Sequence, residues 1–346
     1  MSDALIGAIV RAAGRWSNGD HPPRVRAVRQ TLEAANRFTE EAIGFAVNQQ
    51  MAEISEEALV AWRAGRYALS PRRIGVLNAG NIPFVGLQDF LAVILTGHRY
   101  IGTCSSRSPH LLPAFVREVV NEGALLEATF LKTEDMWKTA EAILATGTDA
   151  TCSWAKERAA LHRVKDLLLR SHRYGVAILD GHETTEDLDG LAEDVLLHEG
   201  AGCRSVAVIW APKGLAPDRC LERFAAFRAV FPPHADTPGA LAMQQAFLAA
   251  VNVPHAYGEG LEFLVSRGDA EPQGPCHVRW IEWEALSDVT SYLAARQGRI
   301  QVVAARAGLR LVLPESLDVV ALGDTQRPRL SWRPDNVDTI GFLASL

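Results

Sequence analysis

The chain has 346 residues, of which 48% are hydrophobic and 22% are charged, and its formal net charge is -6. This composition is ordinary for a soluble globular protein, and the length predicts two domains rather than one. The negative net charge and the lack of a long basic block argue against a nucleic-acid partner. No apolar run approaches the roughly 20 residues that a membrane-spanning helix needs, so we expect no membrane span.

The cysteines and histidines set further limits. There are five cysteines, with no paired-cysteine spacing and no secretory leader, which predicts a protein of the reducing cytoplasm. The two His-Glu pairs, His182-Glu183 and His198-Glu199, are adjacent in the sequence, and this is poor spacing for metal ligands. We therefore expect no metal site.

The first 70 residues predict helices, because apolar residues recur at helical spacing over 25–46 and 53–66. From Pro71 onward, short strands alternate with helices. This alternation predicts a parallel sheet with helices on both faces, as in a Rossmann-type α/β domain. The expected strands are 73–78, 100–104, 128–132, 141–145 (which also fits a helix) and 174–180, with helices over 84–96, 109–121 and 156–170.

A second α/β domain is expected beyond a boundary near 180–186. Its predicted elements are helices over 188–196, 217–230 and 239–251 and strands over 205–210, 277–281 and 299–304. We therefore expect a helical lead-in and cofactor-binding domain over 1–181 and a catalytic domain over 182–320. A tail over 321–346 is expected to pack back on the fold or on a neighbouring subunit.

Cys203 is the candidate nucleophile. The segment from Asp194 to Pro212 predicts an amphipathic helix, a turn with Gly200 and Gly202, the thiol, and then a buried strand. Glycines let another molecule approach the backbone closely, so a thiol at this junction can meet a substrate. Most cysteines are inert buried side chains, and reactivity requires a special electrostatic setting. Among the five, only Cys203 has glycines before it and a strand directly after it.

The first predicted strand ends in the segment Gly80-Asn81-Ile82-Pro83. An asparagine amide at the mouth of a sheet can donate to an oxyanion while a thioester is attacked. Glycine, asparagine and proline also favour ordinary turns, so this segment alone does not separate the two interpretations. Because ligands of parallel sheets bind beyond the C-terminal ends of the strands, we expect a nucleotide at the loops 78–83, 104–108 and 146–151.

Three ordered and widely separated motifs together resemble the LuxC-type acyl-CoA reductases of the aldehyde dehydrogenase superfamily. The first is Gly80-Asn81-Ile82-Pro83 with the apolar helix, Gly97-His98, strand and Ser105-Ser106 that follow it. The second runs from Gly181 through Asp194 to Gly200-Ala-Gly-Cys203-Arg-Ser, and the third is the tail from Trp332 to Leu343. The resemblance extends from about residue 70 to the C-terminus.

The resemblance implies an aldehyde-dehydrogenase-like α/β fold and an oxidoreductase that reduces an acyl thioester to an aldehyde with NADPH or NADH. Cys203 would then accept the acyl group from acyl-CoA or an acyl-carrier thioester, with Asn81 and the backbone N–H of Cys203 at the oxyanion. The family also implies a homo-oligomer and admits a sister acyltransferase or ligase subunit. The candidate cofactor-binding residues are Gly80, Ile82, Pro83, Thr103, Ser105, Ser106, Thr146, Gly147 and Thr148.

The chain departs from the family pattern at two positions. Related enzymes commonly carry a lysine where Thr103 stands, so the choice between NADPH and NADH stays open, and Ser105, Ser106 or Arg107 can take over the phosphate. The glutamate that serves hydrolytic aldehyde dehydrogenases as a base has no match near 178–181. A thioester reductase does not need to activate water, which fits this absence.

Three further points stay open from the sequence. We interpret Glu183 as structural rather than catalytic. The dipole at a helix C-terminus disfavours a thiolate at Cys203. The sequence does not decide whether the positive charge of Arg204 offsets this effect. Two rival functions exist: a non-redox Cys-dependent acyltransferase or thioesterase, which the Thr103 departure mildly favours, and a non-catalytic partner that binds acyl carriers.

Overall fold

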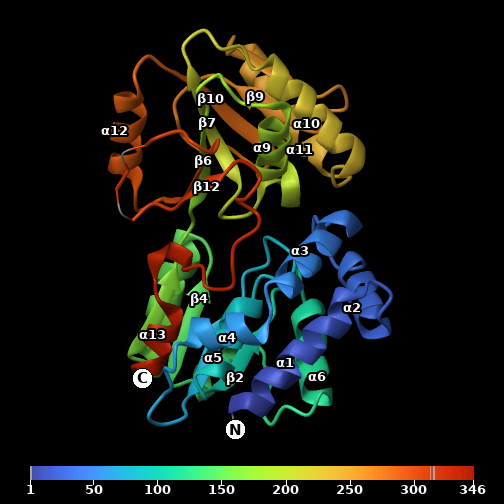
Figure 1. Cartoon of the computed structure of the whole chain (residues 1–346), viewed down its shortest axis with the longest axis vertical. Helices are drawn as coiled ribbons and strands as arrows, with labels where there is room; N and C mark the ends of the chain where they lie inside the picture. Colours follow the sequence, from blue (N-terminus) through green and yellow to red (C-terminus); the bar gives the residue numbers. More distant parts are fainter. Residues whose placement is uncertain (1, 312, 315) are drawn as a thin grey trace. The chain divides into compact units, whose positions relative to one another are not determined.

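A computed structural model describes residues 2–311, 313–314 and 316–346 of the chain, which divides into two compact units (Figure 1). The first unit comprises residues up to Asn36, Glu40–His172 and Arg329–Leu346, and the second comprises Arg37–Thr39 and Arg173–Pro328. The sequence predicts boundaries after residues 181 and 320. The first boundary lies earlier because the strand that begins at Tyr174 pairs with strands of the second unit.

The first unit begins with the expected helical lead-in, which comprises α1 (Ser2–Ser17), α2 (Pro22–Leu32), α3 (Glu40–Ala52) and α4 (Glu56–Arg63). The apolar spacing predicts helix throughout 25–46, but α2 ends at Leu32. The Asn36 amide donates to the Thr31 carbonyl at 2.6 Å, and such side-chain bonds satisfy groups that a helix end leaves open. Trp16 of α1 stacks on Phe84 with ring centroids 5.7 Å apart.

The first unit contains a five-stranded parallel sheet, here called sheet A, in the order β3-β2-β1-β4-β5. The chain order reverses between β1 and β4, and doubly wound sheets bind ligands at such a reversal. The prediction of a parallel sheet is confirmed, and 141–145 forms a strand rather than a helix. The strands are β1 (Arg73–Leu77), β2 (Arg99–Thr103), β3 (Ala128–Phe130), β4 (Ala142–Thr146) and β5 (Asp166–Arg170).

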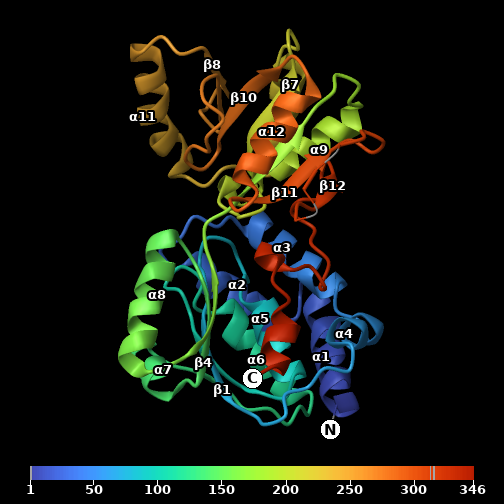
Figure 2. The same cartoon turned by 90° about the vertical axis from the view of Figure 1, so that its left-hand side faces the viewer.

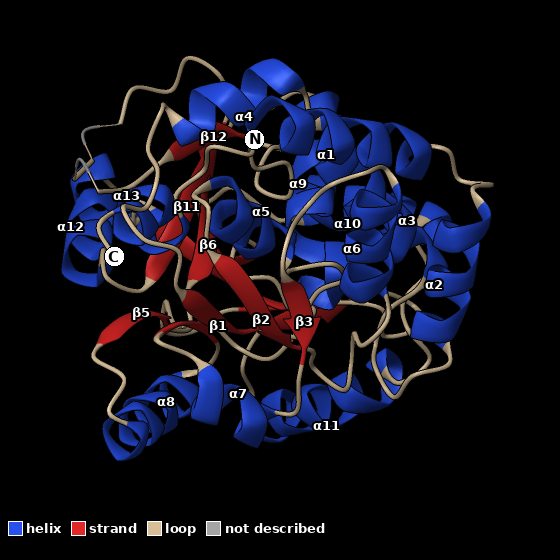
Figure 3. Ribbon diagram, turned by 90° about the horizontal axis from the view of Figure 1, so that it is seen from below, coloured by secondary structure: helices blue, strands red, loops and turns tan. Residues whose placement is uncertain are grey.

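Helices cover both faces of sheet A (Figure 2 and Figure 3). One face carries α5 (Leu87–Leu95) and α6 (Leu111–Asn121), and the other carries α7 (Thr133–Thr139) and α8 (Asp149–His162). Beneath α7 and α8, Trp137 and Ala155 pack with Ile101 and Ile143 of the sheet. This three-layer arrangement leaves the carboxyl ends of the strands as the place where loops gather.

The predicted helix over 156–170 is wrong in its second half. The helix α8 ends at His162, Arg163 adopts a left-handed conformation with φ of 59°, and residues 166–170 form β5. The run Leu167-Leu168-Leu169 fits either a helix or an edge strand, and no glycine or proline marks the break. The short helix α7 was also not predicted from the sequence.

The C-terminal segment packs on the first unit. The Gln88 amide of α5 donates to the carbonyls of Leu330 and Trp332 at 2.8 and 2.7 Å. Further on, η2 (Pro334–Asn336) leads to α13 (Thr339–Ala344), and the buried His98 ring lies 2.8 Å from the Leu343 carbonyl. Residues 329–346 therefore belong to the same core as sheet A.

The second unit contains a seven-stranded sheet, here called sheet B, in the order β12-β11-β6-β7-β10-β9-β8. Only the β8–β9 pairing is antiparallel among the described strands. The sequence did not predict β8, β9 or β12. The strands are β6 (Tyr174–Ile178), β7 (Val206–Pro212), β8 (His255–Tyr257), β9 (Leu264–Ser266), β10 (His277–Trp283), β11 (Ile300–Ala305) and β12 (Val319–Ala321).

Helices α9 (Thr185–Leu196) and α10 (Asp218–Val230) cover one face of sheet B, and α12 (Leu286–Arg296), which was not predicted, covers the other (Figure 1). The helix α11 (Thr237–Ala250) adjoins β8. Leu191 and Val195 of α9 pack with Ile209 and Trp280, so the chain leaving α9 is anchored in the core. Within the described part of the chain, every helix is too short or too polar to cross a bilayer.

A buried ion pair joins β5 to α5. Arg170 Nη1 donates to both carboxylate oxygens of Asp89 at 2.8 Å, and Arg170 Nη2 donates to Thr339 Oγ1 at 2.7 Å. Removing one partner of a buried pair leaves the other charge uncompensated, which typically costs about 3–5 kcal/mol. We predict that Asp89→Ala lowers the free energy of unfolding, measured in urea, by about 3 kcal/mol.

The matched control is Asp166→Ala. Asp166 pairs with Arg72 at 2.9 Å, but both side chains are more than a third exposed. An exposed pair contributes about 1 kcal/mol or less, so this variant is expected to unfold close to wild type. Equal costs in the two variants would contradict the structural role of the Arg170–Asp89 pair.

Candidate active site

The loop after β1 carries the first predicted site residues, Gly80, Asn81, Ile82 and Pro83. It lies at the carboxyl end of β1, next to the reversal of strand order in sheet A. Phe84, which follows, has φ of 61°, is 1% exposed, and packs against Trp16 and Phe115. A non-glycine residue holds this conformation only when its surroundings enforce it, so the loop is fixed by packing.

Position 80 requires a glycine. A Cβ on Gly80 would overlap Ser105 Oγ, so the loops after β1 and β2 are in direct contact. Asn78 ties the same two strands together, because its Nδ2 donates to Tyr100 Oη at 2.9 Å and to the Thr103 carbonyl at 3.0 Å. The predicted site residues of these two strand ends therefore meet.

The end of β2 presents hydroxyl groups and a guanidinium. Thr103 is 6% exposed and its carbonyl is bound by Asn78, so it offers little surface to a ligand. Ser105 is half-buried, while Ser106 and Arg107 are exposed. A carboxylate here typically binds the ribose hydroxyls of NAD, and an arginine accommodates the extra phosphate of NADP. This strand end offers the arginine and no carboxylate.

The end of β4 carries the last predicted group, Thr146, Gly147 and Thr148. Thr148 is the N-cap of α8, and its Oγ1 accepts from Thr151 N at 3.2 Å. A helix N-terminus attracts anions through its exposed N–H groups. Because β2, β1 and β4 are adjacent and parallel, all nine predicted cofactor-binding residues lie at one edge of sheet A.

Cys203 lies in the second unit, in the turn between α9 and β7, and is partly exposed. The predicted order of helix, glycine turn, thiol and strand is confirmed. The turn begins with three successive left-handed residues in η1 (Leu197–Gly200), namely His198, Glu199 and Gly200, with φ of 55°, 57° and 65°. A Cβ on Gly200 would lie 3.0 Å from the nitrogen of Cys276, so both space and conformation favour glycine.

A buried cluster holds this strained turn. The Glu199 carboxylate accepts from Arg228 Nη1 at 3.0 Å and from Thr237 Oγ1, and Arg228 Nη2 donates to Cys276 Sγ at 3.0 Å. Burial raises the pKa of the Cys276 thiol far above its usual range, which disfavours the thiolate that a nucleophile requires. Burial lowers the pKa of His198 to about 4, so its ring is neutral at pH 7.

The residues around Cys203 close a tight turn of their own. Ser205 N donates to the Gly202 carbonyl at 3.0 Å, and Gly202 N donates to Ser205 Oγ at 3.2 Å. Gly175 N of β6 donates to the Ser205 carbonyl at 2.8 Å, and a Cβ on Gly175 would lie 2.6 Å from the Arg204 carbonyl oxygen. The backbone of the turn therefore packs directly on β6.

A buried network centred on Asp194 holds the other side of the turn. Asp194 Oδ1 accepts from Thr325 N at 3.0 Å and Thr325 Oγ1 at 2.6 Å, and its Oδ2 accepts from Gly323 N at 2.8 Å. The Thr325 carbonyl accepts from Arg204 Nε, and the neighbouring Gln326 donates from Nε2 to Ser205 Oγ at 3.4 Å. The loop after β12 is thereby linked to Arg204 and Ser205, the two residues that follow the thiol.

Sequence reasoning gave Asp194 no role, although one signal was present. Asp194 lies on α9 among the buried Leu191, Val195 and Leu196, where a carboxylate needs hydrogen-bond donors. Gly190, one turn earlier on the same face of α9, lets the chain after β12 come close to this helix. A Cβ at position 190 would lie only 2.7 Å from the Leu322 carbonyl oxygen. The donors come from residues more than 100 positions away, which no local pattern reveals.

The two carboxylates after β6 are engaged in structural bonds. Arg306 Nε donates to both oxygens of Asp180, at 2.7 and 2.8 Å. Glu183 is 5% exposed and accepts from the backbone nitrogens of Asp180 and Gly181 at 2.7 and 3.1 Å. Burial raises the pKa of Glu183, but its oxygens point into this turn. The strand itself ends in the fully buried Ile178.

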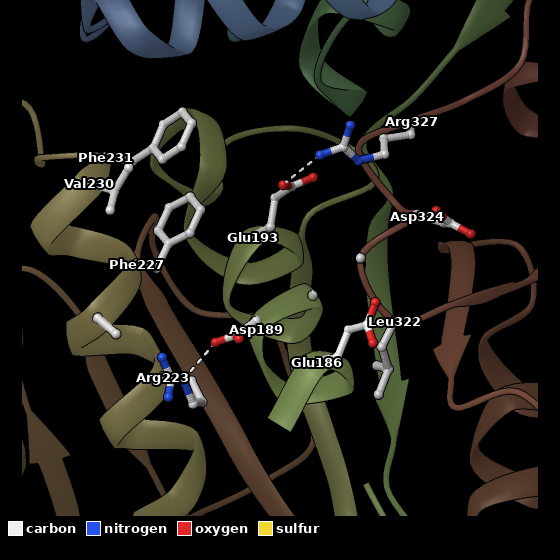
Figure 4. Close-up of a pocket in the computed structure, with 13 residues that line it drawn as sticks. Glu186, Asp189, Glu193, Arg223, Phe227, Val230, Phe231, Leu322, Asp324 and Arg327 are labelled. Carbon is white, nitrogen blue, oxygen red and sulfur yellow. Dashed lines mark hydrogen bonds and ion pairs between the residues drawn. The ribbon is translucent and has the colours of Figure 1, made fainter. Parts of the chain in front are cut away.

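A surface pocket of about 510 Å³ lies between α9, α10 and the loop after β12 (Figure 4). Arg223 pairs with Asp189 at 2.6 Å and Arg327 with Glu193 at 2.8 Å, while Phe227 and Phe231 stack on one side. Four carboxylates against two guanidiniums line it, which is unfavourable for a phosphorylated ligand. Among the described residues, no three His, Cys, Asp or Glu side chains gather in a way that could hold a metal ion.

No protein-family model matches this chain, and no curated protein matches it in sequence. Solved structures do match. Indole-3-acetaldehyde dehydrogenase in complex with NAD+ gives a TM-score of 0.68 at 11% identity, over 89% of this chain and 72% of that chain. Glyceraldehyde-3-phosphate dehydrogenase from Methanocaldococcus jannaschii, complexed with NADP, gives 0.66 at 12%, over 97% and 83%.

Aldehyde dehydrogenase 21 from Physcomitrella patens also matches, with a TM-score of 0.66 at 12% identity over 99% of this chain and 83% of that chain. The chain has an aldehyde dehydrogenase-like fold. At such low sequence identity, these matches show a similar path of the backbone and nothing more.

Asp194 couples the stability of the second unit to pH. Burial raises the pKa of Asp194 to about 7, against the opposing effect of its three hydrogen bonds. A raised carboxyl pKa adds stability below the unfolded value near 4, and this contribution is lost as the pH rises toward 7. We predict that the free energy of unfolding of wild type, minus that of Asp194→Asn, falls between pH 4 and pH 7 in urea titrations. A difference that stays constant or rises over this window would contradict the burial of a titrating carboxyl group.

Proposed function

We propose that this chain is a nicotinamide-dependent oxidoreductase that reduces an acyl thioester to an aldehyde through an acyl-Cys203 intermediate. The observation that carries the proposal is Cys203 itself, a partly exposed thiol in a turn that buried hydrogen bonds hold, on an aldehyde dehydrogenase-like fold. Two structures of this fold contain NAD+ or NADP, which supports a nicotinamide cofactor. Acyl-CoA and acyl-carrier thioesters are the proposed acyl donors.

The chemistry of acyl transfer assigns roles to the residues of the turn. The Cys203 thiolate attacks the thioester carbonyl carbon and forms a new carbon–sulfur bond, and the bond to the donor sulfur breaks. The departing thiolate takes up a proton. The backbone N–H of Cys203 and the amide of Asn81 are the proposed hydrogen-bond donors to the oxyanion. The acyl group then remains on Cys203 as a thioester, whose sulfur donates poorly into the carbonyl and leaves the carbon electrophilic.

The carboxyl edge of sheet A fits a dinucleotide. Gly80 keeps the loop after β1 free of a side chain, Ser106 and Arg107 are exposed at the end of β2, and the N-terminus of α8 follows Thr148. These groups suit phosphates and hydroxyls. When bound, reduced nicotinamide supplies the hydride that releases the acyl group from Cys203 as an aldehyde. Arg107 makes NADPH the proposed form of the cofactor.

The surroundings of β6 favour reduction over hydrolysis. A hydrolytic enzyme of this kind needs a base that activates water. At the end of β6 the carboxylates of Asp180 and Glu183 are held by Arg306 and by backbone N–H groups, and Ile178 is buried. Because both carboxylates are engaged in these contacts, neither suits the role of that base, which supports reduction of the acyl-Cys203 thioester over its hydrolysis.

The decisive experiment is intact-protein mass spectrometry after mixing with a panel of acyl-CoA and acyl-carrier thioesters. We predict that wild type gains the mass of one acyl group and that Cys203→Ala gains none. Adding NADPH or NADH is expected to remove the adduct and release an equal amount of aldehyde. Cys220→Ala is the matched control, because Cys220 is a buried thiol whose pKa burial raises to about 12, and this variant should acylate like wild type.

Each other outcome selects a different function. An adduct that ignores both cofactors but passes to an amine or alcohol indicates the non-redox acyltransferase. An adduct that decays to free acid without cofactor indicates a thioesterase. A chain that gains no adduct from any CoA or carrier thioester is not an acyl-Cys203 enzyme, and the proposal then fails.

Arg107 is expected to set the preference for NADPH. A charged hydrogen bond to the extra phosphate contributes about 1.5–3 kcal/mol, so we predict that Arg107→Ala raises KM for NADPH about tenfold or more. The KM for NADH should change less than about twofold, because NADH lacks that phosphate. Arg73→Ala, at the amino end of β1 and therefore at the opposite edge of sheet A, is the control. If Arg107→Ala raised KM for NADPH and for NADH by the same factor, Arg107 would not be the residue that binds the extra phosphate of NADPH.

A further inference from the structure

Helices α2 and α6 of the first unit pack beside each other (Figure 1), and their side chains leave a groove between them. We call it the α2–α6 groove. Its cavity volume is about 520 Å³, which falls in the range of about 300–1,000 Å³ that is typical of small-molecule sites. The residues that line it differ from those at the carboxyl edge of sheet A and from those of the turn around Cys203.

Both helices and the edge strand β3 contribute apolar side chains to the groove. On α2 the lining residues recur at positions 23, 26, 27 and 30, and on α6 at 113, 116, 117 and 120, so each helix turns one face toward it. An alkyl chain that enters the groove leaves water for an apolar surface, which is favourable. The apolar lining residues are Pro23, Ala27, Pro113, Val116, Val120 and Phe130.

Two arginines, one from each helix, also line the groove. Arg26 lies on α2 and Arg117 on α6, and both residues are exposed. Within the part of the chain that the structure describes, neither of them forms an ion pair, whereas Arg11 and Arg15 of the adjoining α1 both pair with Glu122. The groove therefore presents two positive charges that no carboxylate of the described chain neutralises.

One carboxylate, that of Glu118, lines the groove as well. The residue is 6% exposed, and its two oxygens are already engaged, because Oε1 lies 3.8 Å from Arg15 Nε and Oε2 lies 3.1 Å from His21 Nε2. Two guanidiniums against this single carboxylate leave the groove with a net positive charge. A guanidinium matches the paired oxygens of a carboxylate or a phosphate, so these are the groups that the groove suits.

We propose that the α2–α6 groove is a binding site for an amphipathic anion. Arg26 and Arg117 bind its carboxylate or phosphate group, and the apolar side chains bind the alkyl chain attached to that group. Charge complementarity selects the anion, and the apolar lining selects an anion with a chain over a bare one. Fatty acids and alkyl phosphate esters both carry this chemistry. The site goes beyond the proposed reduction of a thioester, because it involves neither Cys203 nor the nicotinamide cofactor.

The test is isothermal titration calorimetry of the full chain with octanoate and with octyl phosphate. Acetate and inorganic phosphate are the probes for the charged group alone, and octanol is the probe for the chain alone. We expect one saturable site for octanoate or octyl phosphate, and binding at least about tenfold weaker for the three partial probes. Tighter binding of octanoate identifies a fatty acid as the ligand class, and tighter binding of octyl phosphate identifies a phosphate ester.

Variants place the bound anion in the groove. Arg26→Gln combined with Arg117→Gln should weaken binding of the preferred octyl anion about tenfold and leave that of octanol unchanged. Val120→Asp adds a carboxylate at a position that is 46% exposed, and should weaken binding of the anion by repulsion. Arg29→Gln is the matched control, because Arg29 lies on α2 outside the groove, and it should bind like wild type. Thermal unfolding of each variant checks that it is folded.

Three results would overturn the inference. The first is a wild-type chain with no saturable binding of octanoate or octyl phosphate. The second is binding that the folded double arginine variant and Val120→Asp leave unchanged, which would place the anion elsewhere on the chain. The third is inorganic phosphate or acetate binding as tightly as its octyl counterpart, which would remove the role of the apolar walls. The titration uses neither thioester nor cofactor, so its result is independent of the proposed function.

Discussion

The Asp194 carboxylate is fully buried, and a buried carboxylate persists only where hydrogen-bond donors surround it. All three of its donors belong to the loop after β12, at Gly323 and Thr325, so this loop must lie against α9. Once it does, the Thr325 carbonyl is in place for Arg204 and the Gln326 amide for Ser205. One buried carboxylate therefore determines where the turn that bears Cys203 can lie.

Contacts between backbones supply the second constraint on this turn. Gly175, Gly190 and Gly200 each face another backbone at a distance where a Cβ would come within 2.6 to 3.0 Å of it. A side chain at any of them would displace β6, the loop after β12 or the segment before β10. The left-handed residues His198 and Glu199 add strain, which the Glu199–Arg228 ion pair offsets. The backbone that bears Cys203 is therefore held by close packing as well as by hydrogen bonds.

Much of this arrangement follows from the sequence, because the features concerned are local. Alternating strands and helices indicate sheet A, and glycine, asparagine and hydroxyl residues after β1, β2 and β4 identify its carboxyl edge. The glycine turn before Cys203 is equally local. The helix predicted through 156–170 failed because Leu167-Leu168-Leu169 satisfies both periodicities. The sequence does not indicate the Asp194 network, because the hydrogen-bond partners of Asp194 lie 129 and 131 residues away along the chain.

The C-terminal segment of the chain returns to the first unit, and this affects the order in which the two units can fold during synthesis. Residues 329–346 supply acceptors for Gln88 and a hydroxyl for Arg170, yet they are synthesised after every strand of sheet B. While the ribosome is still extending the chain, α5 therefore presents an unfinished apolar surface, with Gln88 and His98 lacking their eventual acceptors. The second unit, which apart from Arg37–Thr39 is continuous from 173 to 328, can reach its final hydrogen bonding first. Residues 329–346 then complete the first unit, so a nascent chain that extends only to residue 328 carries the hydrogen-bonded turn around Cys203 and a first unit that still lacks the acceptors for Gln88 and His98.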